Sequence, residues 1–341
     1  MIKIKNVAEY AGVSISSVSR YLNAPDSLRE ETRVKVQKAV EELNYSPNPL
    51  ARSLRTKTTN TIAFVIPSLT NLYYVDLFSC LHRAATDMGY TVNMLTTNHD
   101  ENLLRKYLRE LPAQNIAGII IAFLDEDGVV DDIRSVQLHM PVVLITSMPN
   151  RQDFNSVFVD ALEGEMRATQ HIIEKGCKRI AFVGGLKDNG PVKEKLRGFE
   201  AAMRKNNIPV DADLLFFDRN HFTTGFWAVR DFMAKDKLPD GIVCATDDIA
   251  IGCVKYLVHN GYQVPKDVKV IGFNGISLIN AYEPSITSIR HPIEATSEEV
   301  VKLLHNRILY PYSKLQQITL YTTLVENTST DPQAPVRFTM D

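Results

Sequence analysis

The feature that most constrains the fold is a set of short, nearly continuous apolar runs separated by stretches of helix length. The first series covers residues 62–66, 92–95, 118–122 and 142–145, and the second covers residues 180–183, 214–217, 242–245 and 268–273. Such runs are typical of parallel strands that are buried on both faces of a sheet. The two series therefore predict an α/β core of two doubly wound lobes. Ligands of such lobes bind at the carboxyl ends of the strands, which here border the cleft between the lobes.

The stretch before this core predicts a helix-turn-helix. Val7, Ala8 and Ala11 have the spacing of a first helix, and Gly12 indicates a tight turn after it. Ser14 can then cap a second helix. The second helix would bury Val18 and Leu22 and would carry Ile15, Ser16, Ser17, Ser19 and Arg20 on or near its outer surface. These short or forked side chains suit base edges in a major groove of DNA. An ordinary helical hairpin is the alternative, but its solvent face would carry Glu and Lys rather than Ser and Arg.

Two further helices are predicted in this headpiece. Ser27 precedes Glu30 by three residues, a capping box that would start a third helix. Its apolar positions would be Val34, Val36, Val40 and Leu43. A very short helix would follow Ser46, with Pro47 at its first position. At about eight residues it is shorter than the roughly 12–15 that a helix needs for marginal stability, so we expect DNA to hold it.

Four motifs in this region are specific in combination. They are Val-Ala-Glu-Tyr-Ala-Gly-Val-Ser with Val-Ser-Arg and Leu-Asn in residues 7–23, Thr-Arg followed by Val in residues 32–36, Leu-Asn-Tyr-Ser-Pro-Asn at residues 43–48, and Ala-Arg-Ser-Leu at residues 51–54. With them the chain resembles the lactose-repressor/galactose-repressor (LacI/GalR) family of transcription regulators. The resemblance implies a homodimer that binds a pseudo-palindromic DNA operator and is more often a repressor.

The resemblance also implies how DNA is bound and released. The two recognition helices of the dimer would enter successive major grooves, and the paired hinge helices would insert a leucine, here Leu54, into the central minor groove. A small molecule between the lobes would change their geometry and unseat the hinge helices. The expected DNA contacts are Ser14, Ile15, Ser16, Ser17, Arg20, Asn23, Ser27, Thr32, Tyr45, Asn48, Ala51, Leu54 and Arg55.

The domain boundaries follow from the same resemblance, whose core is like the periplasmic sugar-binding proteins. We expect a headpiece at residues 1–46, a hinge helix and linker at 47–60 and a core at 61–330. The N-lobe would take about 61–159 and 290–320, and the C-lobe about 160–288 and 321–330, with crossings near 159–161, 287–291 and 320–325. A tail at 331–341 would follow, in a segment that reads as disordered from Asn327 and lacks a leucine heptad.

Charge and composition fit this division. Residues 1–57 hold ten Lys and Arg against six Asp and Glu, and the rest of the chain holds 28 against 34. The basic charge is therefore concentrated where phosphates would be met. The four cysteines form no CxxC pair, so we expect reduced thiols and no metal. With no signal peptide and no apolar run of membrane length, we expect a soluble, cytoplasmic protein without a membrane partner.

Candidate effector contacts lie at strand ends. Asn71 and Tyr74 stand where the family usually reads Asn-Pro-Phe-Phe, so Tyr74 would stack on a sugar ring; the alternative is a core aromatic beside Leu77. Asp160 matches an acidic position common in the family, and its alternative is a cap of the next helix. The full expected set is Asn71, Tyr74, Thr146, Asp160, Lys195, Asn220, Thr246, Asp247, Asn274 and His291.

Three residues of this set depart from the family pattern. Lys195, Thr246 and Asn274 stand where sugar- or purine-binding relatives usually have Arg, Asn and Asp. Lys is a point charge and a neutral amide is a weak partner, whereas Arg and Asp grip a diol from both sides. A neutral sugar or glycoside is the favoured effector, and an acidic effector is the alternative because Lys195 loses its expected counter-charge. Arg197 either supplies the missing contact or is a solvated charge beside Glu194.

Other classes of protein are less well supported. The Gly-rich segment at residues 184–190 has neither dinucleotide-binding nor P-loop spacing, and no nucleophile elbow or His-Glu-x-x-His is present. Asp247, Asp248 and His291 form a conceivable acid/base set, but paired Asp at a helix start usually cap it. We expect no catalysis and no cofactor. A corepressor-dependent purine or general carbon regulator and a sugar-binding transport protein are the remaining alternatives.

Overall fold

A computed structural model gives the fold for residues 2–45, 59–122, 128–147, 153–219 and 221–335. The chain divides into two compact units, residues 1–59 and residues 60–341. The predicted hinge helix, with the expected DNA contacts Asn48, Ala51, Leu54 and Arg55, lies outside the described residues, as does Asn220. No helix in the described part of the chain is long and apolar enough to cross a membrane.

The first unit contains the predicted helix-turn-helix. Its elements are α1 (Ile4–Ala11), α2 (Ile15–Asn23), the 3₁₀ turn η1 (Pro25–Ser27) and α3 (Glu30–Glu42). Gly12 adopts φ 63° and ends α1, a left-handed conformation that glycine tolerates without steric cost. The Ser14 hydroxyl caps α2 by accepting from the Ser17 amide at 3.1 Å. Val7, Val18 and Val36 are fully buried between the three helices.

The predicted start of α3 is wrong. Ser27 belongs to η1, where its hydroxyl donates to the Ala24 carbonyl at 2.7 Å, and α3 begins after Arg29 without a side-chain cap. Glu30 pairs with Arg33 at 2.9 Å instead. Val34 is also misassigned, since it is 53% exposed while Val36 is buried. Residues two apart lie about 200° apart around a helix, so the two valines cannot share one buried face.

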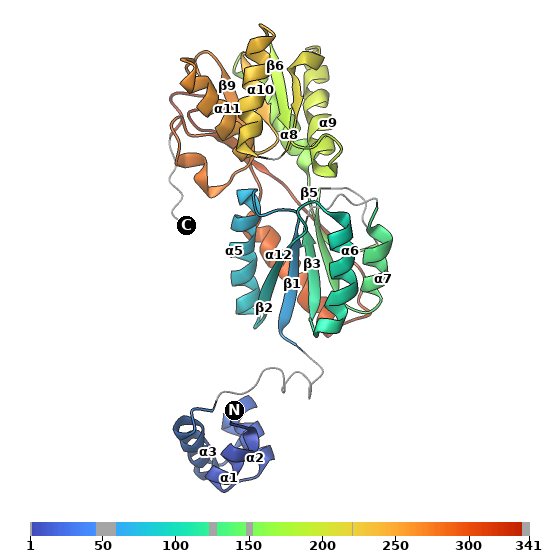
Figure 1. Cartoon of the computed structure of the whole chain (residues 1–341), viewed down its shortest axis with the longest axis vertical. Helices are drawn as coiled ribbons and strands as arrows, with labels where there is room; N and C mark the ends of the chain where they lie inside the picture. Colours follow the sequence, from blue (N-terminus) through green and yellow to red (C-terminus); the bar gives the residue numbers. More distant parts are fainter. Residues whose placement is uncertain (1, 46–58, 123–127, 148–152, 220, 336–341) are drawn as a thin grey trace. The chain divides into compact units, whose positions relative to one another are not determined.

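The second unit consists of two lobes (Figure 1). The N-lobe sheet is parallel, in the order β11-β5-β4-β3-β1-β2. Its strands are β1 (Thr61–Ile66), β2 (Thr91–Thr96), β3 (Gly118–Ala122), β4 (Val142–Thr146), β5 (Asn155–Val159) and β11 (Gln317–Leu320). Apolar side chains of α5 (Leu72–Asp87) and α12 (Ile293–Leu309) cover one face, and those of α6 (Glu101–Glu110) and α7 (Val130–Gln137) cover the other.

The C-lobe repeats this plan. Its sheet order is β12-β10-β9-β8-β6-β7, with β12 antiparallel to β10. The strands are β6 (Ile180–Gly184), β7 (Leu215–Phe217), β8 (Gly241–Cys244), β9 (Lys269–Asn274), β10 (Thr287–Arg290) and β12 (Thr323–Val325). Helices α8 (Ala161–Glu174) and α9 (Gly190–Lys205) cover one face, and α10 (Phe222–Ala234) and α11 (Asp247–His259) cover the other. Short 3₁₀ turns are η2 (Leu111–Gln114), η3 (Ala212–Leu214) and η4 (Ser277–Asn280).

The chain passes between the lobes three times, after β5, after β10 and after β11. The headpiece and the two doubly wound lobes confirm the predicted fold class. Because every strand of the parallel part of each sheet runs in one direction, the carboxyl ends of both sheets border the region between the lobes.

The segment after β12 is not disordered as expected from Asn327. Asn327 and Ser329 are fully buried. The Ser329 amide donates to the Ser285 carbonyl at 2.8 Å, and the Val270 amide donates to the Ser329 carbonyl at 3.1 Å. Its Ser, Thr and Asn side chains look like those of a solvated tail, but the C-lobe satisfies their hydrogen bonds. The described part of the chain therefore packs against the C-lobe through residue 331.

Candidate functional site

The outer face of α2 is the candidate surface for reading DNA. Ile15 is 46% exposed, and Ser16 and Arg20 are also exposed. Ser14 is committed to the helix cap and lies 2.7 Å from the Ser16 hydroxyl oxygen and 2.9 Å from that of Ser17. An exposed guanidinium among small hydroxyl side chains can approach a base edge without hindrance from its neighbours.

The other expected DNA contacts in the headpiece are placed less uniformly. Ser27 is exposed, whereas Thr32 is half-buried. Tyr45 packs against the small core of the headpiece. The backbone of Asn23 ends α2, and its side chain is outside the described part of the structure.

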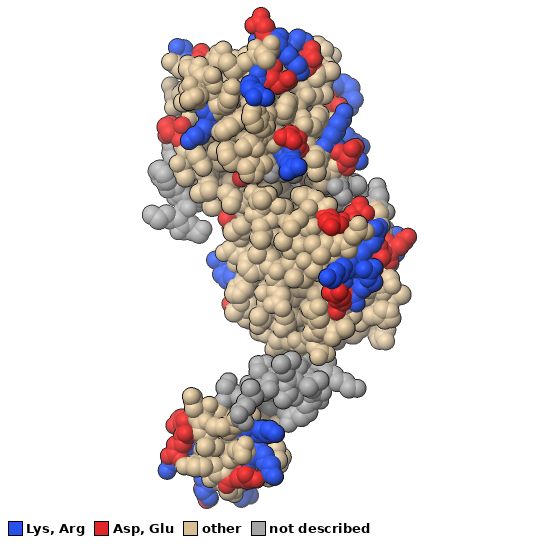
Figure 2. All heavy atoms as spheres, in the orientation of Figure 1, with Lys and Arg blue, Asp and Glu red and all other residues tan. Residues whose placement is uncertain are grey.

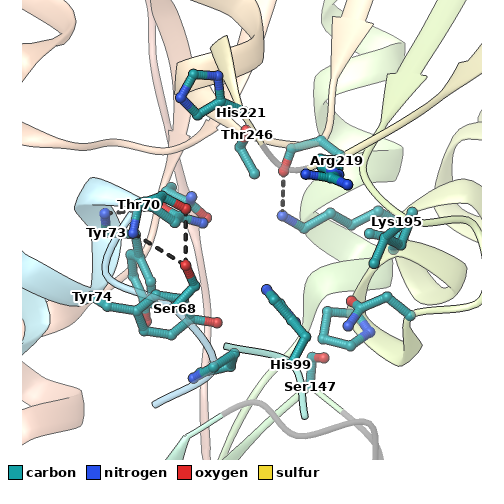
Figure 3. Close-up of a pocket in the computed structure, with 18 of the residues that line it drawn as sticks. Ser68, Thr70, Tyr73, Tyr74, His99, Ser147, Lys195, Arg219, His221 and Thr246 are labelled. Atoms are coloured by element: carbon teal, nitrogen blue, oxygen red, sulfur yellow. Dashed lines mark hydrogen bonds between the residues drawn. The ribbon is translucent and has the colours of Figure 1, made fainter. Parts of the chain in front are cut away.

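A cavity of about 720 Å³ lies between the lobes of the core. Figure 3 shows side chains from both lobes converging on it. The residues of the N-lobe wall lie at or after the carboxyl ends of β1, β2 and β4. Those of the C-lobe wall lie at or after the carboxyl ends of β6, β7, β8 and β9. Six of the expected effector contacts line it, namely Asn71, Tyr74, Lys195, Thr246, Asn274 and His291.

Lys195 is the most constrained charge at the cavity. It is 7% exposed, and its Nζ donates to the Ala245 carbonyl at 2.5 Å and lies 3.7 Å from the centroid of the Phe273 ring. Burial lowers the pKa of Lys195 to about 8, and nearby Glu165 and Asp247 oppose that shift. The Asp247 carboxylate is therefore a nearby counter-charge on the protein side, which corrects the expectation that Lys195 lacks one.

Glu165 was not identified from the sequence. It lies on α8 and is fully buried, and neither carboxylate oxygen has a hydrogen-bond partner among the described residues. Gly198 allows α9 to approach α8 closely, because a Cβ at that position would lie 2.9 Å from the Cβ of Glu165. Burial raises the pKa of Glu165 to about 8, while Lys195 lowers it. No local pattern distinguishes this residue from a surface glutamate of an amphipathic helix.

Asp247 does not line the cavity, contrary to the prediction. Its carboxylate accepts from the Ser288 hydroxyl at 2.5 Å and from the Ile276 amide at 2.9 Å. Burial raises the pKa of Asp247 to about 6, and these hydrogen bonds oppose the increase. Asp247 thus joins β10 to the loop after β9 and faces the sheet rather than a ligand.

Two further expected contacts also lie elsewhere. The Asp160 carboxylate caps α8 by accepting from the Glu163 amide at 2.9 Å, and it is absent from the cavity wall. Thr146 is fully buried in β4, whereas the next residue, Ser147, lines the cavity. Successive residues of a strand point in opposite directions, which explains the error of one position. Arg197 pairs with Glu194 at 2.7 Å and does not reach the cavity.

An aromatic wall joins the two lobes beside the cavity. Tyr73 contacts Tyr74 edge-on at 5.4 Å and lies 4.9 Å from the ring of His291, which itself lies 5.3 Å from Phe273. Burial and, to a smaller extent, the positive charge of Lys195 lower the pKa of His291 to about 3, so the imidazole is neutral. Asn71 caps α5 by accepting from the Tyr73 amide at 3.0 Å. An aromatic ring of this wall can stack on the apolar face of a sugar.

Several cavity residues escaped the sequence analysis. They include Ser68, Tyr73, His99, Ser147, Asp218, Arg219 and His221. Most follow a strand end directly, so the rule that selected the others would also have found them. Among the described residues, no group of His, Cys, Asp and Glu is arranged to hold a metal ion.

Comparisons with known proteins agree with this arrangement. Residues 3–48 match the family "Bacterial regulatory proteins, lacI family", and residues 59–319 match "Periplasmic binding proteins and sugar binding domain of LacI family". The HTH-type transcriptional regulator RegA of Clostridium saccharobutylicum is 35% identical over 90% of this chain and 93% of its own length. The ribose operon repressor of Escherichia coli K12 is 30% identical over 96% of this chain and 100% of its own length. A solved complex of the transcriptional regulator CelR with cellobiose is 25% identical, with a TM-score of 0.71 over 96% of this chain and 100% of that one.

Proposed function

We propose a specific role for this chain, which belongs to the LacI family and is a DNA-binding transcription regulator rather than an enzyme. It represses a carbohydrate-utilisation operon, and its effector is a neutral sugar. The sugar binds between the lobes and changes operator affinity. The relative named as a ribose operon repressor and the cellobiose complex of CelR support a sugar as the class of effector. We place the protein in the cytoplasm, where it meets its operator.

The observation that carries this proposal is the balance of charge around the cavity. Lys195 is accompanied by the Asp247 carboxylate, and the exposed part of the cavity adds Asp218 and Arg219, one charge of each sign. An anionic ligand would therefore find no uncompensated cationic site. The hydroxyl, amide and aromatic groups of the cavity suit a polyhydroxyl ring, because each hydroxyl of a sugar can donate and accept while the ring face stacks.

For the DNA, we propose that Arg20, Ser16 and Ile15 read base edges and that the paired hinge helices insert Leu54 into the minor groove. Support for the first part is the exposure of these side chains on α2. The second part rests on the family resemblance alone. Wedges of this kind unstack a base step and are repaid by contacts to the bent duplex. Replacing Leu54 with Ala should then reduce both operator affinity and the bend angle in a gel-shift assay.

We also propose that the working form is a dimer that covers the outer face of α10 and α11. Phe222 and Trp227 on α10 are each 43% exposed, and Val258 on α11 is 49% exposed. Figure 2 shows mostly uncharged residues over the middle of this part of the C-lobe, with charged side chains gathered at its upper end. Sedimentation of Trp227→Glu should show a monomer. Leu138→Glu, at an 82% exposed apolar residue on the N-lobe, is the control and should stay dimeric.

Operator binding tests the first half of the function. The full-length protein would be used to select operators from random duplex DNA, and anisotropy would then compare the selected and random sequences. Arg20→Ala should lose about 1–3 kcal/mol on the operator and far less on random DNA. Arg29→Ala, at an exposed position outside α2, is the control. Equal losses on both DNAs for Arg20→Ala would make it a phosphate contact.

Calorimetry tests the second half. D-ribose, cellobiose, ribose 5-phosphate and inorganic phosphate would be titrated into the protein, and operator affinity would be measured with each. A neutral sugar should bind and change operator affinity, and Lys195→Ala should weaken its binding about tenfold or more without altering effector-free DNA affinity. Lys193→Ala, exposed on the same helix, should leave sugar binding intact. Binding of the phosphates alone would contradict a neutral effector.

A further inference from the structure

A polar contact joins the two lobes beside the cavity but outside its wall. Asp76 lies on α5 of the N-lobe, and Ser277 is the first residue of η4 in the C-lobe. The Asp76 carboxylate accepts from the Ser277 amide at 2.9 Å and from the Ser277 hydroxyl at 3.2 Å. Figure 1 shows the orange segment that contains η4 close to the end of α5 that faces the C-lobe. Neither residue lines the cavity.

A like charge lies on the C-lobe side of this contact. Asp248, in the first turn of α11, is 9% exposed, and its Oδ2 is buried without a hydrogen-bond partner among the described residues. Burial raises the pKa of Asp248 to about 7, and the carboxylates of Asp247 and Asp76 add to the increase. Since Asp247 is held by its own hydrogen bonds within the C-lobe, Asp76 is the one of these two charges that changes position when the lobes move.

From this geometry we propose that Asp76 and Ser277 form a latch that sets the angle between the lobes, and that Asp248 opposes it. The three crossovers are the connections about which the lobes can turn, and each lobe is a sheet packed between helices on both faces. A contact between α5 and η4 is made at one lobe angle and lost at another. Repulsion between Asp76 and Asp248 works in the opposite direction, so the balance between the two angles depends on both.

The consequence is that the Asp76 and Asp248 carboxylates have opposite effects on the angle between the lobes. Removing the Asp76 carboxylate takes away two hydrogen bonds to a charged acceptor, whereas removing the Asp248 charge takes away only the repulsion. Hydrogen bonds to charged groups are strong enough to shift a conformational ratio about tenfold. A residue that merely stabilises the fold would not produce changes of opposite sign at these two positions.

Distance measurements between the lobes test the latch without an effector or DNA. Spin labels would be placed by Lys106→Cys on α6 and Lys193→Cys on α9, both exposed, in a Cys80→Ser background because the other three cysteines are buried. Labelled chains would be diluted with unlabelled chains so that only distances within one chain are recorded. The parent should give one dominant distance.

Asp76→Ala should add a second distance population, raising its ratio to the first about tenfold. Ser277→Ala, which keeps the amide donor, should give a smaller change in the same direction. Asp76→Asn should stay close to the parent, because the amide oxygen still accepts from Ser277 and the loss of a charged acceptor is offset by the loss of repulsion from Asp248. Asp248→Asn should narrow the distribution, which is the change of opposite sign.

The control is Asp87→Ala, an exposed aspartate at the other end of α5. It should leave the distribution unchanged, and thermal unfolding would confirm that every variant is folded. A distribution that is the same in Asp76→Ala and the parent would overturn the proposal. Changes of the same sign in Asp76→Ala and Asp248→Asn would overturn it as well, because they would indicate general loosening of the contact.

Discussion

The first strand of the N-lobe, β1, contains Ile62-Ala63-Phe64-Val65, and the first strand of the C-lobe, β6, contains the same four residues as Ile180-Ala181-Phe182-Val183. Phe64 packs toward α5 and α12, and Phe182 packs toward α9 and α8, so equivalent side chains face equivalent layers. The apolar framework of the two lobes is the same.

The buried polar residues differ between the lobes. Among the described residues, those of the N-lobe are Ser, Thr and Asn only, whereas the C-lobe and the second crossover bury Glu165, His171, Glu194, Lys195, Asp247, Asp248 and His291. Burying a charge costs free energy unless it is paired. The buried polar groups of the N-lobe are therefore neutral, whereas the C-lobe and the second crossover bury groups that can change charge.

Because the apolar framework is shared, core substitutions should cause the largest losses of stability, and these losses should be equal in the two lobes. Phe64→Ala and Phe182→Ala should each lower the free energy of unfolding by about 3–5 kcal/mol, because each leaves a cavity in a fully buried core. Urea unfolding followed by circular dichroism measures both. A markedly smaller loss for one of them would show that the two cores are not packed alike.

Substitutions at closely packed glycines should affect the stability of the two lobes differently. In the C-lobe a Cβ added at Gly252 would lie 1.9 Å from the Phe222 carbonyl oxygen, and backbone cannot move aside easily. In the N-lobe a Cβ at Gly118 would lie 2.7 Å from the end of the Leu304 side chain, which can rotate, and 3.0 Å from the Pro141 carbonyl oxygen, which is a much milder clash with backbone. Gly252→Ala should therefore cost about 3 kcal/mol of unfolding free energy and Gly118→Ala about 1 kcal/mol. Equal losses in the same urea experiment would remove this difference.

The buried acid of the C-lobe predicts a dependence of stability on pH. The pKa of Glu165 rises from its ordinary 4.5 to about 8 on folding. An acid with a raised folded pKa stabilises the fold below its unfolded pKa and loses that contribution as the pH rises to the folded value. Stability should thus fall between about pH 4.5 and 8 by up to about 1.4 kcal/mol per pH unit.

Glu165→Gln should flatten that part of the curve, measured by urea unfolding from pH 5 to pH 8. Glu174→Gln, exposed on the same helix, is the matched control and should keep the slope of the parent. An unchanged slope in Glu165→Gln would assign the pH dependence to other groups of the C-lobe.

Removing surface ion pairs should have the smallest effects on stability, and these effects should be equal in the two lobes. Arg134 of the N-lobe bonds Asp153 at 2.7 Å, and Lys237 of the C-lobe bonds Asp213 at 2.8 Å, both at the surface. Solvent and salt screen such pairs, so Arg134→Ala and Lys237→Ala should hardly change the unfolding midpoint at physiological salt. A clear loss in one of them would mean that surface charge also distinguishes the lobes.

The sequence by itself determined the framework of this protein. Apolar runs of strand length predict the parallel sheets, and the glycine and serine at positions 12 and 14 predict the turn and the cap of the headpiece. These signals are local: a strand's burial, a positive φ and a helix cap each depend on residues within a few positions. The rule that ligands meet at strand ends also placed Lys195, Thr246 and Asn274 at the cavity.

Only the tertiary structure decided which polar residues face the cavity and which lie behind its wall. Asp247 follows a strand like its neighbour Thr246, yet its carboxylate is taken by Ser288 and a backbone amide from other segments. Glu165 is buried because α9 lies against α8, and the segment after Asn327 is ordered because the C-lobe accepts its hydrogen bonds. In each case the partner is distant in the sequence, so the free energy that fixes the side chain exists only once the lobes have packed.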